Sequence, residues 1–179
     1  MSTSTTTVPV LPHTLTPPLD PRSSITDTLY RAVLAFDTND SALLHSSLTE
    51  DATFDLNGRV CEGLPAIHRD CFDRVGRLNT MHFVTNVRVH IYPSKDGDAD
   101  GDGEKAALTA SSLSQHFREG EGLGSGKEVG TVEERLMAGN FYYCDLIKEG
   151  SEEGGVWKIQ KFIVKSTWAE GEWGVMSGK

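Results

Sequence analysis

The sequence predicts an α+β fold: a cone-shaped α+β barrel in which a curved, mostly antiparallel sheet wraps around helices and leaves an internal pocket. Helical patterns and one hairpin occupy the first half of the chain, and long strand patterns fill the second half. Such segregation is typical of α+β domains with helices on one face of a sheet. A pocket enclosed in this way is the usual place for a small ligand. The length of 179 residues suits a single domain.

The clearest strand pattern is Thr80–Tyr92, which alternates with the period of two that strands require. One side of this strand is expected to carry Met81, Phe83, Val87, Val89 and Ile91, and the other side His82, Val84, Asn86, Arg88 and His90. His82 lies near the start of the strand, where a side chain can face the mouth of a pocket. That position makes His82 a candidate general base.

Composition narrows the possible partners. The chain has a net charge of −9 and a pI near 5.1, whereas nucleic acids and anionic membranes are bound through clustered Lys and Arg. No apolar run approaches the ~20 residues that span a bilayer, and the N-terminus lacks a secretory pattern. Cys61, Cys71 and Cys144 have no metal-binding spacing, which favours a reduced, cytoplasmic setting. We therefore expect no nucleic acid and no membrane partner, and the expected pocket suits a small-molecule substrate.

The chain divides into an arm, a domain and a tail. Residues 1–22 are dominated by Ser, Thr and Pro, so they are expected to form a disordered arm that buries too little apolar surface to fold. The domain is expected to span 23–175, with a short tail at 176–179.

The first helix is expected to open at Ser23 and Ser24, with Asp27 as a capping-box acid. Its apolar face has helical spacing and consists of Leu29, Ala32, Val33 and Phe36. Asp37 follows at the helix end, where the negative end of the helix dipole disfavours a carboxylate. Asp37 is therefore either a functional group or a turn-capping carboxylate.

Shorter elements follow. A second helix is expected from Asp40 or Ser41, then a strand at 51–56 that returns through the Asn57-Gly58 hairpin signal. Pro65 suits the first turn of a third helix.

Three further strands are expected at 106–117, 129–147 and 156–168, separated by glycine-rich loops. The acidic segment 95–104 resembles an EF-hand loop, but no Glu stands at the twelfth position. We expect a solvated hairpin loop there.

Four segments resemble, in order and spacing, the SnoaL-like branch of the nuclear transport factor 2-like superfamily, with scytalone dehydratase and hexachlorocyclohexane dehydrochlorinase as relatives. The resemblance covers about Ser23 to Trp173. Its segments are Ala35-Phe-Asp-Thr-Asn-Asp40, Glu50-Asp-Ala-Thr-Phe-Asp55, Met81-His-Phe-Val-Thr-Asn86, and Gly155-Val-Trp-Lys158 with the strand to Trp168. The resemblance implies that the protein forms homo-oligomers, either dimers or trimers, and that it uses no cofactor or metal.

The resemblance implies that Asp37 and His82 form a catalytic dyad, and His116 resembles a second active-site histidine. Phe36 and Leu56 stand where scytalone dehydratase has tyrosines, and its Ser and Asn on the penultimate strand align near Phe141 and Tyr143. The expected substrate-binding residues are Tyr30, Phe36, Phe54, Leu56, Asn86, Tyr143, Phe162 and Trp168.

These residue types suit proton abstraction next to a carbonyl. An imidazole is a base near neutral pH, and a carboxylate on one ring nitrogen fixes its tautomer. Both histidines also have non-catalytic interpretations. His82 could be a core residue that hydrogen-bonds a backbone carbonyl, and His116 could be an exposed residue at a strand end. No Ser-His-Asp set or phosphate-binding loop is evident from spacing.

The sequence thus predicts a cofactor-free lyase of the dehydratase type that acts on a small cyclic or polyketide-derived hydroxyketone. His82 takes the proton, Asp37 orients His82, and His116 assists the loss of water. The alternatives are an isomerase or cyclase, an epoxide hydrolase with the same dyad, or a non-catalytic ligand-binding or association module.

Overall fold

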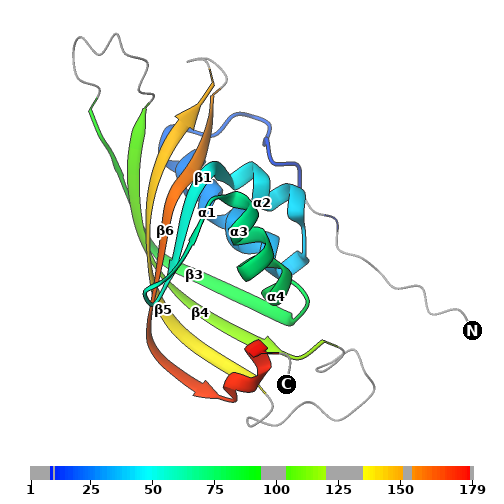
Figure 1. The fold of residues 1–179 in the computed structure, drawn as a ribbon. Coiled ribbons are helices and arrows are strands. Elements are labelled where there is room, and N and C mark those ends of the chain that lie inside the picture. The colour runs from blue at the N-terminus through cyan, green and yellow to red at the C-terminus, as the bar shows by residue number, and fades with distance from the viewer. Residues whose placement is uncertain (1–8, 10, 94–103, 120–134, 151–154, 178–179) are drawn as a thin grey trace, which may run out of the picture.

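The fold is an α+β cone in which one curved sheet wraps around a group of helices (Figure 1). The computed structural model describes residues 9, 11–93, 104–119, 135–150 and 155–177. The helical elements are α1 (Pro21–Thr38), α2 (Ser41–Ser47), α3 (Leu64–Ile67), the π-helix η1 (His68–Phe72), α4 (Asp73–Val75) and the 3-10 helix η3 (Trp173–Ser177). The strands are β1 (Leu48–Leu56), β2 (Arg59–Glu62), β3 (Asn79–Ile91), β4 (Lys105–Phe117), β5 (Arg135–Glu149) and β6 (Val156–Gly171).

The six strands form one sheet in the order β2-β1-β6-β5-β4-β3. Only β1 and β6 pair in parallel; the other neighbours are antiparallel. The helices α1 to α4 lie on the concave face of the sheet, as Figure 1 shows. The predicted fold class, a curved and mostly antiparallel sheet around helices, is confirmed.

Helix α1 begins at Pro21, two residues before the expected start. The reason is Asp20, whose carboxylate accepts hydrogen bonds from the backbone N–H groups of Arg22 and Ser23 at 3.0 and 3.2 Å. An N-cap aspartate followed by proline is a strong helix start. Asn39 follows the helix as its C-cap in the left-handed conformation, and Asp40 then caps α2 by accepting from the N–H of Leu43 at 2.9 Å. The second helix thus starts at Ser41, one of its two expected positions.

Strand β3 contains a bulge that the alternation did not reveal. Its pairing with β4 shifts between Thr85 and Arg88, and Asn86 has a φ of 55°. One extra residue in the bulge reverses the faces, because side chains alternate with a period of two. The expected grouping of Met81 and Phe83 with the later apolar residues is therefore wrong: these two are exposed. The inward residues are Thr80, His82 and Val84 before the bulge, and Val87, Val89 and Ile91 after it.

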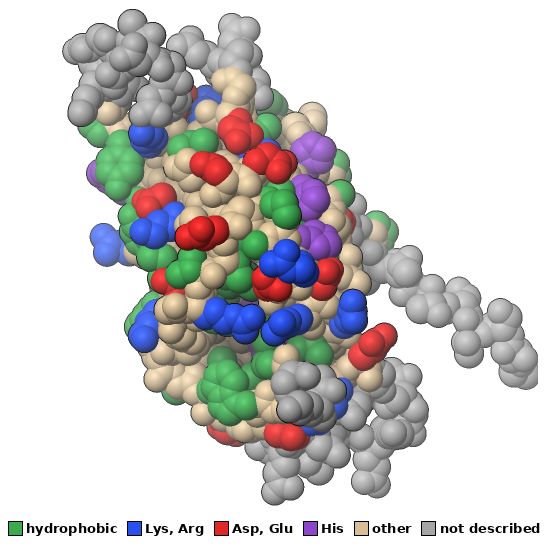
Figure 2. Space-filling model, viewed as in Figure 1, with side chains coloured by type: hydrophobic (Ala, Val, Ile, Leu, Met, Phe, Trp, Pro, Cys, Tyr) green, Lys and Arg blue, Asp and Glu red, His purple; other side chains and the backbone are tan. Residues whose placement is uncertain are grey.

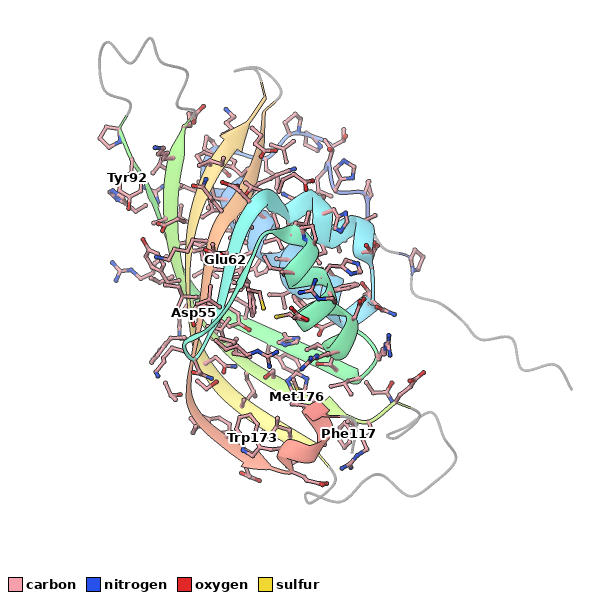
Figure 3. All side chains as sticks on the ribbon, in the orientation of Figure 1. Asp55, Glu62, Tyr92, Phe117, Trp173 and Met176 are labelled. Carbon is pink, nitrogen blue, oxygen red and sulfur yellow. The ribbon has the colours of Figure 1, made fainter. Side chains whose placement is uncertain are left out.

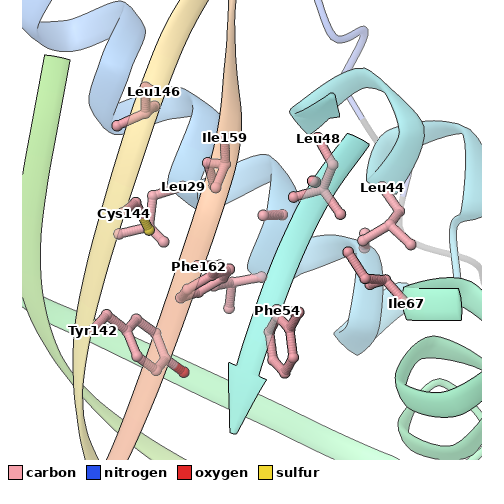
Figure 4. Packing of buried hydrophobic residues seen from close by; sticks show 14 of the residues in the cluster. Leu29, Leu44, Leu48, Phe54, Ile67, Tyr142, Cys144, Leu146, Ile159 and Phe162 are labelled. Carbon is pink, nitrogen blue, oxygen red and sulfur yellow. The ribbon is translucent and has the colours of Figure 1, made fainter. Parts of the chain in front are cut away.

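The hydrophobic core lies between α1, α2, α3 and the concave face of the sheet (Figure 4). Ile25, Leu29, Leu44, Ile67 and Ile159 are fully buried there. The core fills the upper part of the cone in Figure 1, so the histidine-bearing ends of β3 and β4 lie below it.

Parts of the sequence predictions fall outside the described residues. Residues 1–8 and 10 of the expected arm, most of the acidic loop at 95–104 and the glycine-rich segments within 120–134 and 151–154 belong to this group. At the other end, η3 extends regular structure to Ser177, past the expected boundary at 175. No helix of the described chain combines the length and apolarity that a membrane crossing requires.

Candidate active site

Asp37 and His82 meet on the concave side of the sheet. Asp37 lies one residue before the end of α1, and His82 lies in the first half of β3. The Nδ1 atom of His82 is 2.6 Å from Oδ1 of Asp37, and the backbone N–H of His82 donates to Oδ2 at 2.9 Å. Both side chains are almost buried, with 13% of His82 and 9% of Asp37 exposed. Two contacts to one carboxylate fix the ring, and Nε2 is the nitrogen without a protein partner among the described residues.

His116 lies beside this pair on the neighbouring strand β4. The two imidazole rings are 5.3 Å apart in a T-shaped arrangement. His116 is 5% exposed, and its Nδ1 atom is 2.7 Å from the hydroxyl of Thr80. Burial, followed by the neighbouring His82, lowers the pKa of His116 to about 4. His116 is therefore neutral at pH 7, with its remaining nitrogen available to a ligand.

A cavity of about 310 Å³ opens in front of the two histidines. His82, Ser114 and His116 form its polar end on β3 and β4. Most of the remaining wall is apolar and includes Val33, Phe36, Phe54, Leu56, Cys61, Cys71, Val75, Leu136, Ala138, Phe162, Val164 and Met176. Such an enclosed, mostly apolar space with a few polar groups suits a small ligand.

Four of the expected substrate-binding residues line this cavity. They are Phe36, Phe54, Leu56 and Phe162. Phe36 also contacts the dyad, with its ring 6.4 Å from that of His82. Phe54 and Phe162 pack edge to face at 5.3 Å and form a buried part of the cavity wall.

The other four expected residues lie outside the cavity wall. Tyr30 lies on the solvent side of α1 in a separate groove. Asn86 occupies the β3 bulge, and Tyr143 points to the opposite face of β5, where its hydroxyl donates to Asp145 at 2.6 Å. Trp168 follows a register shift in β6 that turns it outward. The structure does not bring these four side chains to the cavity: Tyr30 lies on the outer side of a helix, and bulges or strand phase turn the other three away.

Sequence reasoning missed the polar groups of β5 by one residue. Asn140 and Tyr142, rather than Phe141 and Tyr143, face the cavity. The Oδ1 atom of Asn140 accepts from Ser166 at 2.8 Å, and burial raises the pKa of Tyr142 to about 12. The alternation of the segment contains the signal, since Ala138, Asn140 and Tyr142 share the phase of buried Cys144.

The exposed residues at the cavity entrance form what we call the rim: Leu56, Asn57, Arg59, Arg74 and Trp173. Figure 3 shows Trp173 and Met176 on the C-terminal helix η3, below the helices α3 and α4. The buried side chain of Val175 anchors η3. The tail expected at 176–179 therefore begins within a helix that contributes to the cavity.

Within the described part of the chain, no three His, Cys, Asp or Glu side chains come together as a metal site would require. The fold does assemble a Ser-His-Asp contact that the sequence spacing did not indicate. Ser41 Oγ is 3.0 Å from His68 Nε2, and His68 Nδ1 is 3.2 Å from Asp73. None of these three residues lines the cavity.

The cone with an Asp-His pair inside defines a class of small α+β barrel. The chain belongs to the SnoaL-like domain family, whose model matches residues 17–163. It is similar to terrestric acid biosynthesis cluster protein E of Penicillium crustosum, with 42% identity over 93% of this chain and 96% of that protein. The recognition of this family from the sequence is confirmed.

Solved structures share the fold at low sequence identity. A putative scytalone dehydratase from Novosphingobium aromaticivorans matches with a TM-score of 0.61 and 16% identity. The match covers 84% of this chain and 86% of the dehydratase chain. A hexachlorocyclohexane dehydrochlorinase from Novosphingobium barchaimii matches with a TM-score of 0.59 and 19% identity. The match covers 86% of this chain and 91% of the dehydrochlorinase chain.

Proposed function

We propose that this protein is a cofactor-free lyase that removes water from a small cyclic or polyketide-derived hydroxyketone. The observation that carries the proposal is the buried contact of His82 Nδ1 with Asp37 at 2.6 Å beside a largely apolar cavity. The carboxylate holds the proton on Nδ1, which leaves the lone pair of Nε2 to act as a base.

In the proposed reaction, Nε2 of His82 takes the proton on the carbon next to the ketone, and the electron pair of that C–H bond forms an enolate. The enolate re-forms the carbonyl and makes a carbon–carbon double bond as the C–O bond of the β-hydroxyl group breaks. The imidazolium of His82 returns its proton to the departing oxygen, which leaves as water. One base therefore serves both steps and ends the cycle neutral.

His116 acts as a neutral hydrogen-bond donor in this proposal. Its low pKa removes the imidazolium form at neutral pH. With Thr80 donating to Nδ1, the N–H of His116 Nε2 is free to stabilise the enolate oxygen. This role replaces direct protonation of the leaving hydroxyl group.

The relatives support the choice of substrate and reaction. The similar Penicillium protein is named for a biosynthetic cluster, which favours a secondary metabolite as substrate. Two proteins with the same fold are named as a dehydratase and a dehydrochlorinase, and both names describe eliminations.

The test is to incubate the protein with cyclic β-hydroxyketones in D₂O and follow both hydrogen exchange and loss of water by NMR. We expect exchange at the carbon next to the ketone and formation of the unsaturated ketone, and both should be lost in His82→Ala. Exchange without loss of water would instead indicate an isomerase or cyclase. Equal activity in the wild type and in folded His82→Ala would refute the mechanism.

We also propose that the protein is a homo-oligomer that associates through the convex face of the sheet. Exposed apolar side chains gather there on four adjacent strands: Met81, Phe83, Leu113, Phe141 and Trp168. Large exposed apolar patches mark association surfaces. Phe83→Arg should lower the mass measured by light scattering, whereas Val60→Arg on β2 should not; an unchanged mass in Phe83→Arg would refute this interface.

A further inference from the structure

The rim of the cavity carries a pair of arginines that the proposed dehydration does not use. Arg59 begins β2, and Arg74 lies in α4; both are exposed and both line the cavity. Figure 2 shows Lys and Arg side chains in a row across the region between the β1–β2 turn and α4. In a chain with 26 acidic and 17 basic residues, such a concentration of positive charge is unexpected.

One carboxylate, Asp70, lies at the same part of the cavity wall. Arg69 occupies both of its oxygens, with Nε to Oδ1 at 3.1 Å and the terminal nitrogen to Oδ2 at 2.6 Å. The pKa of Asp70 is lowered mainly by this hydrogen bond, with smaller contributions from the charges of Arg74 and Arg59. Arg59, Arg74 and Asp70 thus line one cavity, and the charges of both arginines act on the Asp70 carboxylate.

Arg59 and Arg74 form no ion pair with a carboxylate among the described residues. Among the residues that the structure describes, Asp70 is the only acidic side chain of the cavity wall, and each of its two oxygens already accepts a hydrogen bond from Arg69. The rim thus presents two positive groups to whatever enters the cavity.

We propose that Arg59 and Arg74 form a carboxylate-binding subsite, so that the natural substrate is a hydroxyketone with a carboxylic acid group. The planar guanidinium group matches the two oxygens of a carboxylate. The apolar wall holds the ring of the substrate, the rim holds its carboxylate, and the reacting carbon faces His82. This assignment rests on the proposed function for the hydroxyketone part, but the charge preference itself does not.

The experiment measures equilibrium binding of chromanone carboxylate and of its uncharged methyl ester by isothermal titration calorimetry. The wild type should bind the carboxylate about tenfold more tightly than the ester, and Arg59→Gln and Arg74→Gln should each remove about threefold of that preference. The double variant should bind the two compounds equally. Raising the salt concentration should weaken binding of the carboxylate only.

Arg77→Gln is the matched control, because Arg77 is an exposed arginine near α4 that does not line the cavity. It should keep the full preference for the carboxylate. Equal binding of acid and ester by the wild type, no detectable binding of the acid, or an undiminished preference in the double variant would each overturn the subsite.

The same titrations, set beside the dehydration assay of the wild type, separate this proposal from the dehydration. If no cyclic hydroxyketone loses water but the acid is still preferred through Arg59 and Arg74, the subsite stands and the lyase mechanism fails. If water is lost but acid and ester bind alike, the subsite alone fails.

Discussion

Replacing Asp37 with asparagine tests the catalytic pair most directly. The carboxylate accepts from both the ring and the backbone N–H of His82, and an amide has one acceptor oxygen for these two donors. If the amide oxygen keeps the backbone contact, its NH₂ group faces Nδ1 and favours the tautomer with a proton on Nε2. That tautomer has no lone pair for the substrate.

The expected magnitude follows from the charge that Asp37 supplies. An imidazolium and a carboxylate about 4 Å apart attract by about 4 kcal/mol at an effective dielectric constant of about 20. The near-burial of both side chains justifies that value. Losing this attraction as His82 becomes protonated should slow catalysis about 10³-fold.

The assay is the rate of hydrogen exchange in a cyclic β-hydroxyketone in D₂O, measured by NMR for the wild type, Asp37→Asn and Asp40→Asn. Asp40 is the control because it is a nearby aspartate whose carboxylate accepts from the N–H of Leu43 and does not line the cavity. Asp40→Asn should therefore exchange at close to the wild-type rate. A folded Asp37→Asn variant within about threefold of the wild type would refute the role of Asp37.

Two predictions concern stability. The pKa of His116 is lowered from 6.5 to about 4, so the unfolded chain binds a proton more readily and stability falls as the pH drops from about 6.5 to about 4. His116→Gln should therefore lose about 3 kcal/mol less than the wild type between pH 7 and pH 4 in urea unfolding; equal losses would contradict the burial effect. Gly139→Ala should destabilise the fold by about 1–3 kcal/mol, because its Cβ would lie 2.2 Å from the indole of Trp168. An unchanged melting temperature and tryptophan fluorescence would contradict that contact.

The sequence was sufficient where local pattern and chain order carry the information. The start of the second helix at Ser41, the Asn57-Gly58 hairpin and the order of helices followed by long strands all appear as predicted. The meeting of Asp37 with His82 was predicted only through the family resemblance, because 45 positions separate them and no local rule pairs a helix end with a particular strand residue.

The errors of placement on the strands have one physical origin. A strand places alternate residues on opposite faces, so a single misjudged or inserted residue moves a side chain from the cavity to solvent. This happened at Asn86, at Trp168 and in the choice of Tyr143 over Tyr142. The rim was missed for a different reason: Arg59 and Arg74 face one cavity only after the β1–β2 hairpin folds against the helices.

The bulge at Asn86 divides β3 into two halves whose inward faces are set independently. The half before it presents His82 to the cavity, and the half after it presents Val87, Val89 and Ile91 to the core. If the strand kept all its residues but lost the bulge, Thr85 and Asn86 could no longer both face outward, and one half would then have to turn over. If the core half kept its orientation, His82 would move to the convex surface while the fold persisted. The bulge is therefore what lets one strand present His82 to the cavity and its apolar residues to the core on the same concave side of the sheet.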